Sequence, residues 1–187
     1  MTDEIELTPT SYIVLGLLSM FGEATPYDLK GMGSASIGQF WTLPHSQIYA
    51  EPARLARAGY LSETQEQGGR RRKRYSLAGR GRQAFDDWLG VLTPEPYLLR
   101  DVALLKLFFG ANVHELAEVQ LETHRQKLAE YTALGEMDPG TGPRGPWLAL
   151  DLGLKHERAT VGFWEQHARA GKQKLPARAR RSSRARD

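Results

Sequence analysis

Five consecutive cationic side chains occupy residues 70–74 of a chain of 187 residues. Like charges this close repel one another, so the run needs a fixed anionic partner, such as phosphate oxygens, or belongs to a merely solvated segment. The choice depends on whether the run lies inside a fold. Its members are Arg70, Arg71, Arg72, Lys73 and Arg74.

The residues around this run predict a β-hairpin. The segments 59–67 (GYLSETQEQ) and 70–77 (RRRKRYSL) have strand character, and Gly68–Gly69 between them provide a turn. The cationic run therefore lies in and beside a hairpin tip and is not a loose tail. Residues alternate between the faces of a strand, so the three arginines nearest the tip are best placed to contact phosphates together.

Two helices are predicted before the hairpin from their caps. Thr8 and Thr25 each precede a proline, the pattern of an N-cap followed by proline at the first helical position. The first helix is apolar nearly all round, which indicates burial. The second is expected to weaken early, at Gly31 and Gly33. Residues 36–44 are interpreted as a connector anchored by two aromatic side chains.

A third helix follows Pro44 and has two different faces. Apolar or small residues recur at spacings of four, three and four and form its inward stripe. The stripe consists of Ile48, Pro52, Leu55 and Gly59. The opposite side carries Ser46, Gln47, Ala50, Arg54 and Arg57.

A fourth helix over about residues 79–92 has Phe85, Trp88, Leu89 and Leu92 on one side. The order of three helices, a hairpin and a helix predicts a winged helix-turn-helix. In that arrangement the third helix enters the DNA major groove and the hairpin wing lies along the backbone. Arginines on a wing tip would then neutralise phosphates and release condensed counterions.

Candidate DNA-binding residues follow from these positions. Ser46, Gln47 and Ala50 would face base edges, and glutamine can make paired hydrogen bonds with adenine. His45 has a similar placement, although a turn residue is the alternative. Phosphate contacts, which position a protein without reading sequence, are expected from Tyr49, Arg54, Arg57, Arg70, Arg71, Arg72, Lys73 and Arg74.

The second half of the chain is predicted to be helical. An apolar helix over 97–110 precedes a long helix, capped by Asn112, that extends to about Leu134. The last helix begins at Trp147 with a heptad-like seam through Glu157 and Trp164. Residues 172–187 carry seven Lys or Arg and one Asp, and this low-complexity segment is expected to be disordered.

The motifs resemble those of the PadR family of bacterial transcriptional regulators, in order over nearly all of residues 8–170. They include YIVLGLLS, TPYDLK, FWTLPHSQIYAEPARLARAGYL, GGRRRKRYSLAGRG and RDVALLKLFFG. The resemblance implies a homodimeric repressor, released from its operator by a small aromatic or drug-like molecule. Pro52 and Ala78 depart from the family pattern, so we expect a recognition helix that is kinked or starts late and a fourth helix frayed at its start.

Aromatic residues in the second half suggest an effector pocket, with core or dimer interface as the alternative. These candidates are Phe108, Trp147, Phe163 and Trp164, and Phe109 shares their character. The family resemblance favours effector binding where the aromatic side chains meet across a dimer axis.

Enzyme chemistry is not expected. The chain has no cysteine, and no motif places a nucleophile on a sharp turn or beside a base. His114 and His124 lie ten residues apart, and His156 and His167 eleven apart, which is not the spacing of metal ligands on one helix face. We predict neither a metal nor a cofactor, and interpret His124 as a buried or interface residue.

The predicted fold class is mainly α with a small β-hairpin, a winged helix-turn-helix followed by an all-helical dimerisation domain. The domains are residues 8–94 for DNA binding, 95–171 for dimerisation and effector binding, and the disordered basic tail 172–187. The predicted function is a cytoplasmic, sequence-specific regulator that binds double-stranded operator DNA as a homodimer, without membrane contact. A winged helix that binds only protein is the alternative function, and an activator is indistinguishable from a repressor at this level.

Deleting residues 172–187 should weaken binding to all DNA sequences about equally. Its six net positive charges add affinity through counterion release, which carries no sequence information. Fluorescence titrations with operator and random duplexes measure both affinities. A collapse of the ratio between them would assign the tail to the specific interface.

Overall fold

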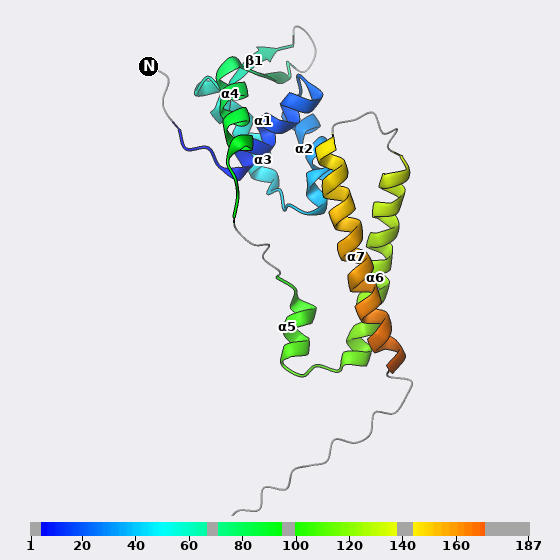
Figure 1. Cartoon of the computed structure of the whole chain (residues 1–187). Helices are drawn as coiled ribbons and strands as arrows, with labels where there is room; N and C mark the ends of the chain where they lie inside the picture. Colours follow the sequence, from blue (N-terminus) through cyan, green and yellow to red (C-terminus); the bar gives the residue numbers. More distant parts are fainter. Residues whose placement is uncertain (1–4, 67–70, 95–99, 138–143, 171–187) are drawn as a thin grey trace, which may run out of the picture. The chain divides into compact units, whose positions relative to one another are not determined.

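The computed structural model describes residues 5–66, 71–94, 100–137 and 144–170 (Figure 1). The chain divides into two compact units, Met1–Pro96 and Tyr97–Asp187. The described residues are mainly helical, with one antiparallel two-stranded sheet. The predicted fold class is thereby confirmed. The predicted turn at Gly68–Gly69 and the basic tail lie outside the described residues.

The first unit contains the predicted order of elements. They are α1 (Pro9–Phe21), α2 (Pro26–Ala35), the 3-10 turn η1 (Ile37–Gln39), α3 (His45–Arg57), β1 (Leu61–Gln65), β2 (Lys73–Leu77) and α4 (Gly79–Gly90).

Two capping boxes start the first helices where the sequence predicts. The Thr8 backbone N–H donates to Ser11 Oγ at 2.8 Å, and the Ser11 N–H donates to Thr8 Oγ1 at 3.4 Å. Thr25 and Asp28 form the same reciprocal pair at the start of α2. Each box satisfies N–H groups that have no partner inside the helix.

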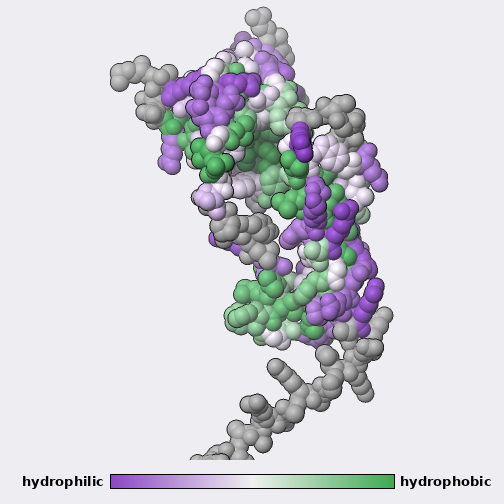
Figure 2. Space-filling view, viewed as in Figure 1, coloured by the Kyte–Doolittle hydropathy of each residue, from purple (hydrophilic) through white to green (hydrophobic). Residues whose placement is uncertain are grey.

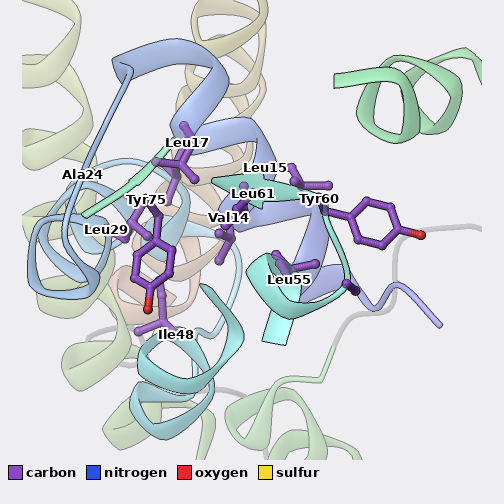
Figure 3. Packing of buried hydrophobic residues seen from close by; sticks show 12 residues of the cluster. Val14, Leu15, Leu17, Ala24, Leu29, Ile48, Leu55, Tyr60, Leu61 and Tyr75 are labelled. Carbon is purple, nitrogen blue, oxygen red and sulfur yellow. The ribbon is translucent and has the colours of Figure 1, made fainter. Parts of the chain in front are cut away.

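The core of this unit gathers residues from α1, α2, α3 and both strands (Figure 3). Val14 and Leu15 of α1, Leu29 of α2 and Leu55 of α3 are fully buried. Tyr75 of β2 is also buried, and its backbone exchanges two hydrogen bonds with Ala24, which extends the sheet by one bridge. The hairpin is thus attached to the helices through its second strand.

Two local expectations about α2 and the following connector were wrong. Helix α2 continues past Gly31 and Gly33 to Ala35. A Cβ at Gly33 would lie 2.8 Å from Leu43 Cδ1, so this glycine allows close packing against the connector. Phe40 and Trp41 do not anchor the connector, since they are 66% and 46% exposed. Ile37 and Leu43 contact the core instead.

Pro52 is accommodated inside α3. The helix begins at His45, directly after Pro44, so the expectation of a late start was wrong. Pro52 lies in the buried stripe with Ile48 and Leu55, where its ring packs in the core. This packing offsets the hydrogen bond that proline cannot donate to the carbonyl of Ile48. Helix α4 begins at Gly79, and Ala78 before it provides no side-chain cap. The fraying expected at this end of the helix stays a prediction.

The second unit contains α5 (Val102–Phe108), α6 (Val113–Glu136) and α7 (Arg144–Ala170). Asn112 caps α6 as predicted, by accepting from the N–H groups of His114 and Glu115. The apolar segment before it forms a shorter helix than expected, because the Asp101 carboxylate caps α5 at Val102.

Helices α6 and α7 form the packed pair of this unit. Trp164 of α7 is buried with Ala117 of α6 and Ala103 of α5. His124 Nδ1 lies 2.6 Å from a carboxylate oxygen of Glu157, which is buried in the seam. His124 therefore occupies the inter-helix position that its spacing predicts.

Helix α5 leaves most of its apolar side chains exposed. Figure 2 shows hydrophobic surface over this helix. Phe108 and Phe109 are 82% and 77% exposed. A contiguous apolar surface of this kind is typical of an interface with another protein chain.

Replacing Gly81 with alanine should destabilise the first unit. A Cβ at Gly81 would lie 2.1 Å from the backbone oxygen of Tyr60, so α4 must move away from the residue that precedes β1. We expect the free energy of unfolding to fall by about 3 kcal/mol. Chemical denaturation monitored by circular dichroism measures it.

The matched control is Gly79→Ala in the same first turn of α4. No atom lies within 4 Å of a Cβ there, so stability should be unchanged or slightly higher. Equal effects of the two substitutions would contradict the close approach at Gly81.

Candidate nucleic-acid interface

Helix α3 presents a polar face to solvent while its other face is in the core. Ser46, Gln47 and Ala50 are exposed, and Tyr49 is 43% exposed. These side chains are near one another because they occupy the first two turns of one helix. His45 is the first residue of α3, and its side chain lies outside the described residues.

Gln47 is held by a residue of α1. The Thr10 hydroxyl donates to Gln47 Oε1 at 3.0 Å, and Thr10 itself is 9% exposed. The carboxamide nitrogen of Gln47 remains available as a donor to a partner outside the chain. Gln47 therefore combines an exposed position with a fixed orientation.

One turn further along α3, Glu51 lies at the centre of a buried hydrogen-bond network. Its Oε1 accepts from Ser11 Oγ at 2.5 Å. Arg54 donates to both oxygens, from Nε at 2.9 Å and from Nη2 at 2.7 Å. Burial alone would raise the pKa of Glu51, but the hydrogen bonds from Arg54 and Ser11 and the charge of Arg54 outweigh burial and hold that pKa below its usual range.

This network engages Arg54, one of the expected phosphate donors, inside the protein. Besides Glu51, its guanidinium donates to the backbone oxygen of Glu6 from both Nη atoms at 3.2 Å. All three nitrogens of the group are thus engaged inside the protein. Arg57, one turn later, is exposed and donates to the Ala53 carbonyl at 3.4 Å.

The hairpin divides its cations into two groups. Lys73 Nζ lies 2.7 Å from Glu63, and Arg74 Nε lies 2.5 Å from Glu23. Arg74 also lies 3.5 Å from Glu66. These two cations are therefore largely neutralised by acidic neighbours.

Arg71 and Arg72 differ from their neighbours in having exposed side chains that form no ion pair within the described part of the chain. Their backbone is nevertheless fixed. The Arg71 carbonyl accepts from Gln65 Nε2 at 3.3 Å, and the Arg72 carbonyl accepts from the Glu66 N–H at 3.0 Å. Arg70 lies outside the described residues.

Three exposed aromatic side chains of this unit were not predicted to be exposed. Tyr27, at the start of α2, is 73% exposed, and Phe40 and Trp41 precede α3. The exposure of Tyr27 could have been predicted from the spacing in α2. Leu29 and Gly33, four residues apart, define the buried side of this helix, and Tyr27 does not lie on that side.

The four aromatic candidates for effector binding do not form one cluster within the described part of the chain. Phe163 and Trp164 are in edge contact, with ring centroids 4.9 Å apart, and Trp164 is buried. Phe108 contacts Phe109 instead. Trp147 lies at the other end of α7, about 25 Å from Trp164 at roughly 1.5 Å per residue.

Among the described residues, no group of three or more His, Cys, Asp or Glu side chains is arranged to hold a metal ion. No described helix has both the length and the apolar character needed to cross a membrane.

Comparison with known proteins gives consistent matches to both units. A family model described as the transcriptional regulator PadR-like family matches residues 14–87, and one described as the virulence activator alpha C-term matches residues 99–170. The negative transcriptional regulator PadR of Bacillus subtilis is 31% identical over 169 residues, which cover 82% of this chain and 92% of that protein.

Solved structures agree with these matches. The crystal structure of Bacillus subtilis PadR in complex with operator DNA superimposes with a TM-score of 0.76 at 27% identity, covering 88% of this chain and 99% of that one. The structure of the same protein in complex with p-coumaric acid gives a TM-score of 0.72 at 28% identity, covering 90% and 100%.

Replacing Glu51 with glutamine should lower stability at neutral pH and make it less sensitive to acid. At pH 7 the free energy of unfolding should fall by about 1–3 kcal/mol, because Arg54 loses its buried anionic partner. The pKa of Glu51 is lower in the folded chain than in the unfolded one, so its contribution is present above about pH 4.3 and lost as the pH falls through the folded value. The two proteins should therefore converge in acid.

Thermal unfolding between pH 7 and pH 3 measures this convergence. The matched control is Glu66→Gln, whose carboxylate is partly exposed and 3.5 Å from Arg74, and which should change stability little. A difference between wild type and Glu51→Gln that stays constant down to pH 3 would contradict the network.

Proposed function

The chain belongs to the PadR family of transcriptional regulators, and from this premise we propose that its first unit binds operator DNA through α3 and the hairpin wing. The observation that carries the proposal is the combination of two features in one unit. These are the polar exposed face at the start of α3 and the exposed arginines Arg71 and Arg72, which form no ion pair with the part of the chain that the structure describes. In a winged helix-turn-helix such features serve base reading and backbone binding respectively.

The geometry refines the roles of the predicted residues. We assign Ser46, Gln47 and Ala50, with His45 beside them, to the base edges of the major groove. The outer side chains of the face, Tyr49 and Arg57, serve phosphates. We leave Arg54 out of this interface, because its donors bind Glu51 and Glu6.

On the wing, Arg71 and Arg72, with Arg70 beside them, supply the phosphate contacts. Lys73 and Arg74 contribute less, since acidic side chains already compensate their charges. Each phosphate neutralised releases a condensed counterion, which makes the affinity depend steeply on salt.

We propose that the regulator acts as a homodimeric repressor. The related Bacillus subtilis protein is named a negative transcriptional regulator. The exposed apolar side chains of α5 supply a surface for a second copy in the segment 95–171. A two-fold dimer places two recognition helices in major grooves about one helical turn apart, roughly 34–36 Å.

A small aromatic effector, of the kind represented by p-coumaric acid in the related structure, fits the same proposal. Among the four aromatic candidates, Phe108 and Phe163 have exposed rings that a ligand can reach, whereas Trp164 is buried in helix packing. Trp147 is too far along α7 to share one small pocket with Trp164 in the same chain. We place the protein in the cytoplasm with the DNA it binds, and give residues 172–187 a role in non-specific affinity.

A winged helix that binds only protein remains the second candidate. The division of cations on the wing favours DNA, because a protein-binding tip would carry mixed or apolar side chains. The salt dependence of binding separates the two functions.

Replacing Arg71 and Arg72 together with alanine should lower the salt dependence of DNA binding. The change removes two phosphate contacts per wing and four per dimer. At about 0.9 per phosphate, the slope of log affinity against log salt should fall by about 3–4 units, while the preference among operator variants persists. Fluorescence titration at several salt concentrations measures the slope.

The control removes the same net charge from exposed positions outside α3 and the wing. Arg82→Ala combined with Arg158→Ala should leave the slope nearly unchanged. An unchanged slope in the wing variant would show that the wing does not touch phosphates, and the protein-binding alternative would then be preferred.

A further inference from the structure

The hydroxyl of Thr10 donates one hydrogen bond within the described residues, and its acceptor is the side chain of Gln47. It is the second residue of α1, almost buried, and its Oγ1 donates to Gln47 Oε1 at 3.0 Å. A buried hydroxyl without a partner is unfavourable, so this hydrogen bond constrains both side chains.

The usual alternative for a hydroxyl in a helix is absent at this position. Such a side chain commonly donates to the carbonyl four residues earlier. Within the described residues, three helical threonines and the serine that ends α2 do so. They are Ser36, Thr123, Thr132 and Thr160. For Thr10 that carbonyl belongs to Glu6, which precedes the helix and accepts from Arg54.

The hydrogen bond belongs to a two-rung connection between α1 and α3. Consecutive residues of α1, Thr10 and Ser11, donate to residues one turn apart on α3, Gln47 and Glu51. Two such bonds, together with the buried stripe of α3, oppose rotation of the helix about its own axis. Gln47 is thus presented to its partner in one orientation.

This orientation has a consequence for base recognition. Adenine is read by a glutamine whose Oε1 accepts from adenine N6 while its nitrogen donates to N7. In this chain Oε1 of Gln47 points toward Thr10. The amide nitrogen is bonded to the same carbon as Oε1 and therefore points away from Thr10. Oε1 keeps a second lone pair, but the bond to Thr10 fixes its direction. The two N–H groups of the amide nitrogen form no hydrogen bond with the described residues and are the groups most available to DNA, and guanine presents two adjacent acceptors, N7 and O6, in the major groove.

We propose that Thr10 is a positioning residue that holds Gln47 as a hydrogen-bond donor, so that α3 selects guanine rather than adenine at the base Gln47 meets. This inference rests on the proposed DNA-binding function. It differs from the paired hydrogen bonds with adenine that a glutamine side chain can also make.

The test compares Thr10→Val, which removes the hydroxyl with little change of shape, with Thr10→Ser, which keeps it. Selection from randomised duplexes first gives the operator, and Gln47→Ala identifies the base pair whose preference depends on Gln47. Competition titrations at that base pair then give the ratio of guanine to adenine affinity. We expect wild type and Thr10→Ser to prefer guanine, and Thr10→Val to lose at least fivefold of that preference, with the salt slope unchanged.

A double-mutant comparison excludes a general loss of structure. In the Gln47→Ala background, Thr10→Val should have no further effect on base preference, because the group it positions is gone. Circular dichroism checks folding, and Thr10→Ala replaces Thr10→Val should the latter not fold.

Several outcomes overturn the inference. These are a wild type that prefers adenine at the Gln47-dependent base pair, a guanine preference unchanged in Thr10→Val, or an equal loss at base pairs independent of Gln47. A wild type that enriches no sequence would overturn the proposed function itself, and is distinguishable because no Gln47-dependent base pair would then exist.

Discussion

The buried carboxylate of Glu51 connects the first helix of the winged unit to the helix that carries its polar face. A charge at this depth is unfavourable unless hydrogen bonds and an opposite charge compensate it, and Ser11 and Arg54 do both. The same network binds the backbone of Glu6 and so fixes the segment before α1. The rotation of α3, and with it the residues it exposes, depends on this compensation.

The surface chemistry of the unit follows from which cations have internal partners. Arg54 is used to stabilise Glu51, and Lys73 and Arg74 face Glu63, Glu23 and Glu66. On α3 and the wing, the described cations without an acidic partner are Arg57, Arg71 and Arg72. The positive surface of the wing is thus smaller and more localised than the five consecutive cations of residues 70–74 suggest. Localised charge of this kind positions a protein on DNA and leaves base reading to the helix.

The second unit combines a well-packed helix pair with a poorly covered third helix. Helices α6 and α7 bury Trp164 and enclose the pair of His124 and Glu157 in their seam. Helix α5 contributes Ala103 to that core but leaves Phe108 and Phe109 in solvent. Burial of those side chains against a second copy would contribute roughly 25 cal/mol per Å² of apolar area, which supports the proposed homodimer.

Much of the fold could be predicted from the sequence because the signals are local. The caps at Thr8, Thr25 and Asn112 lie within three residues of the groups they satisfy, and the hairpin and buried stripes follow from short periodicities. The short α5 shows the limit of this approach, since the apolar composition of residues 97–110 outweighed the capping signal of Asp101. The exposed Phe40 and Trp41 show the same limit, because the aromatic character of a side chain does not determine whether it is buried in the core.

The tertiary structure alone decided which of the predicted site residues are free to act. Thr10, Ser11 and Glu23, which bind Gln47, Glu51 and Arg74 respectively, lie 37, 40 and 51 residues from them in the chain. No short sequence pattern carries such pairings, because they arise only when helices and strands pack and bring distant side chains within hydrogen-bond distance. Sequence by itself determined the family, the order of elements and the exposed face of α3. Packing decided that Arg54 binds Glu6 and Ser11, that Arg71 and Arg72 form no ion pair with the described residues, and that Gln47 is held by Thr10, since a hydrogen bond depends on positions in space and not on separation along the chain.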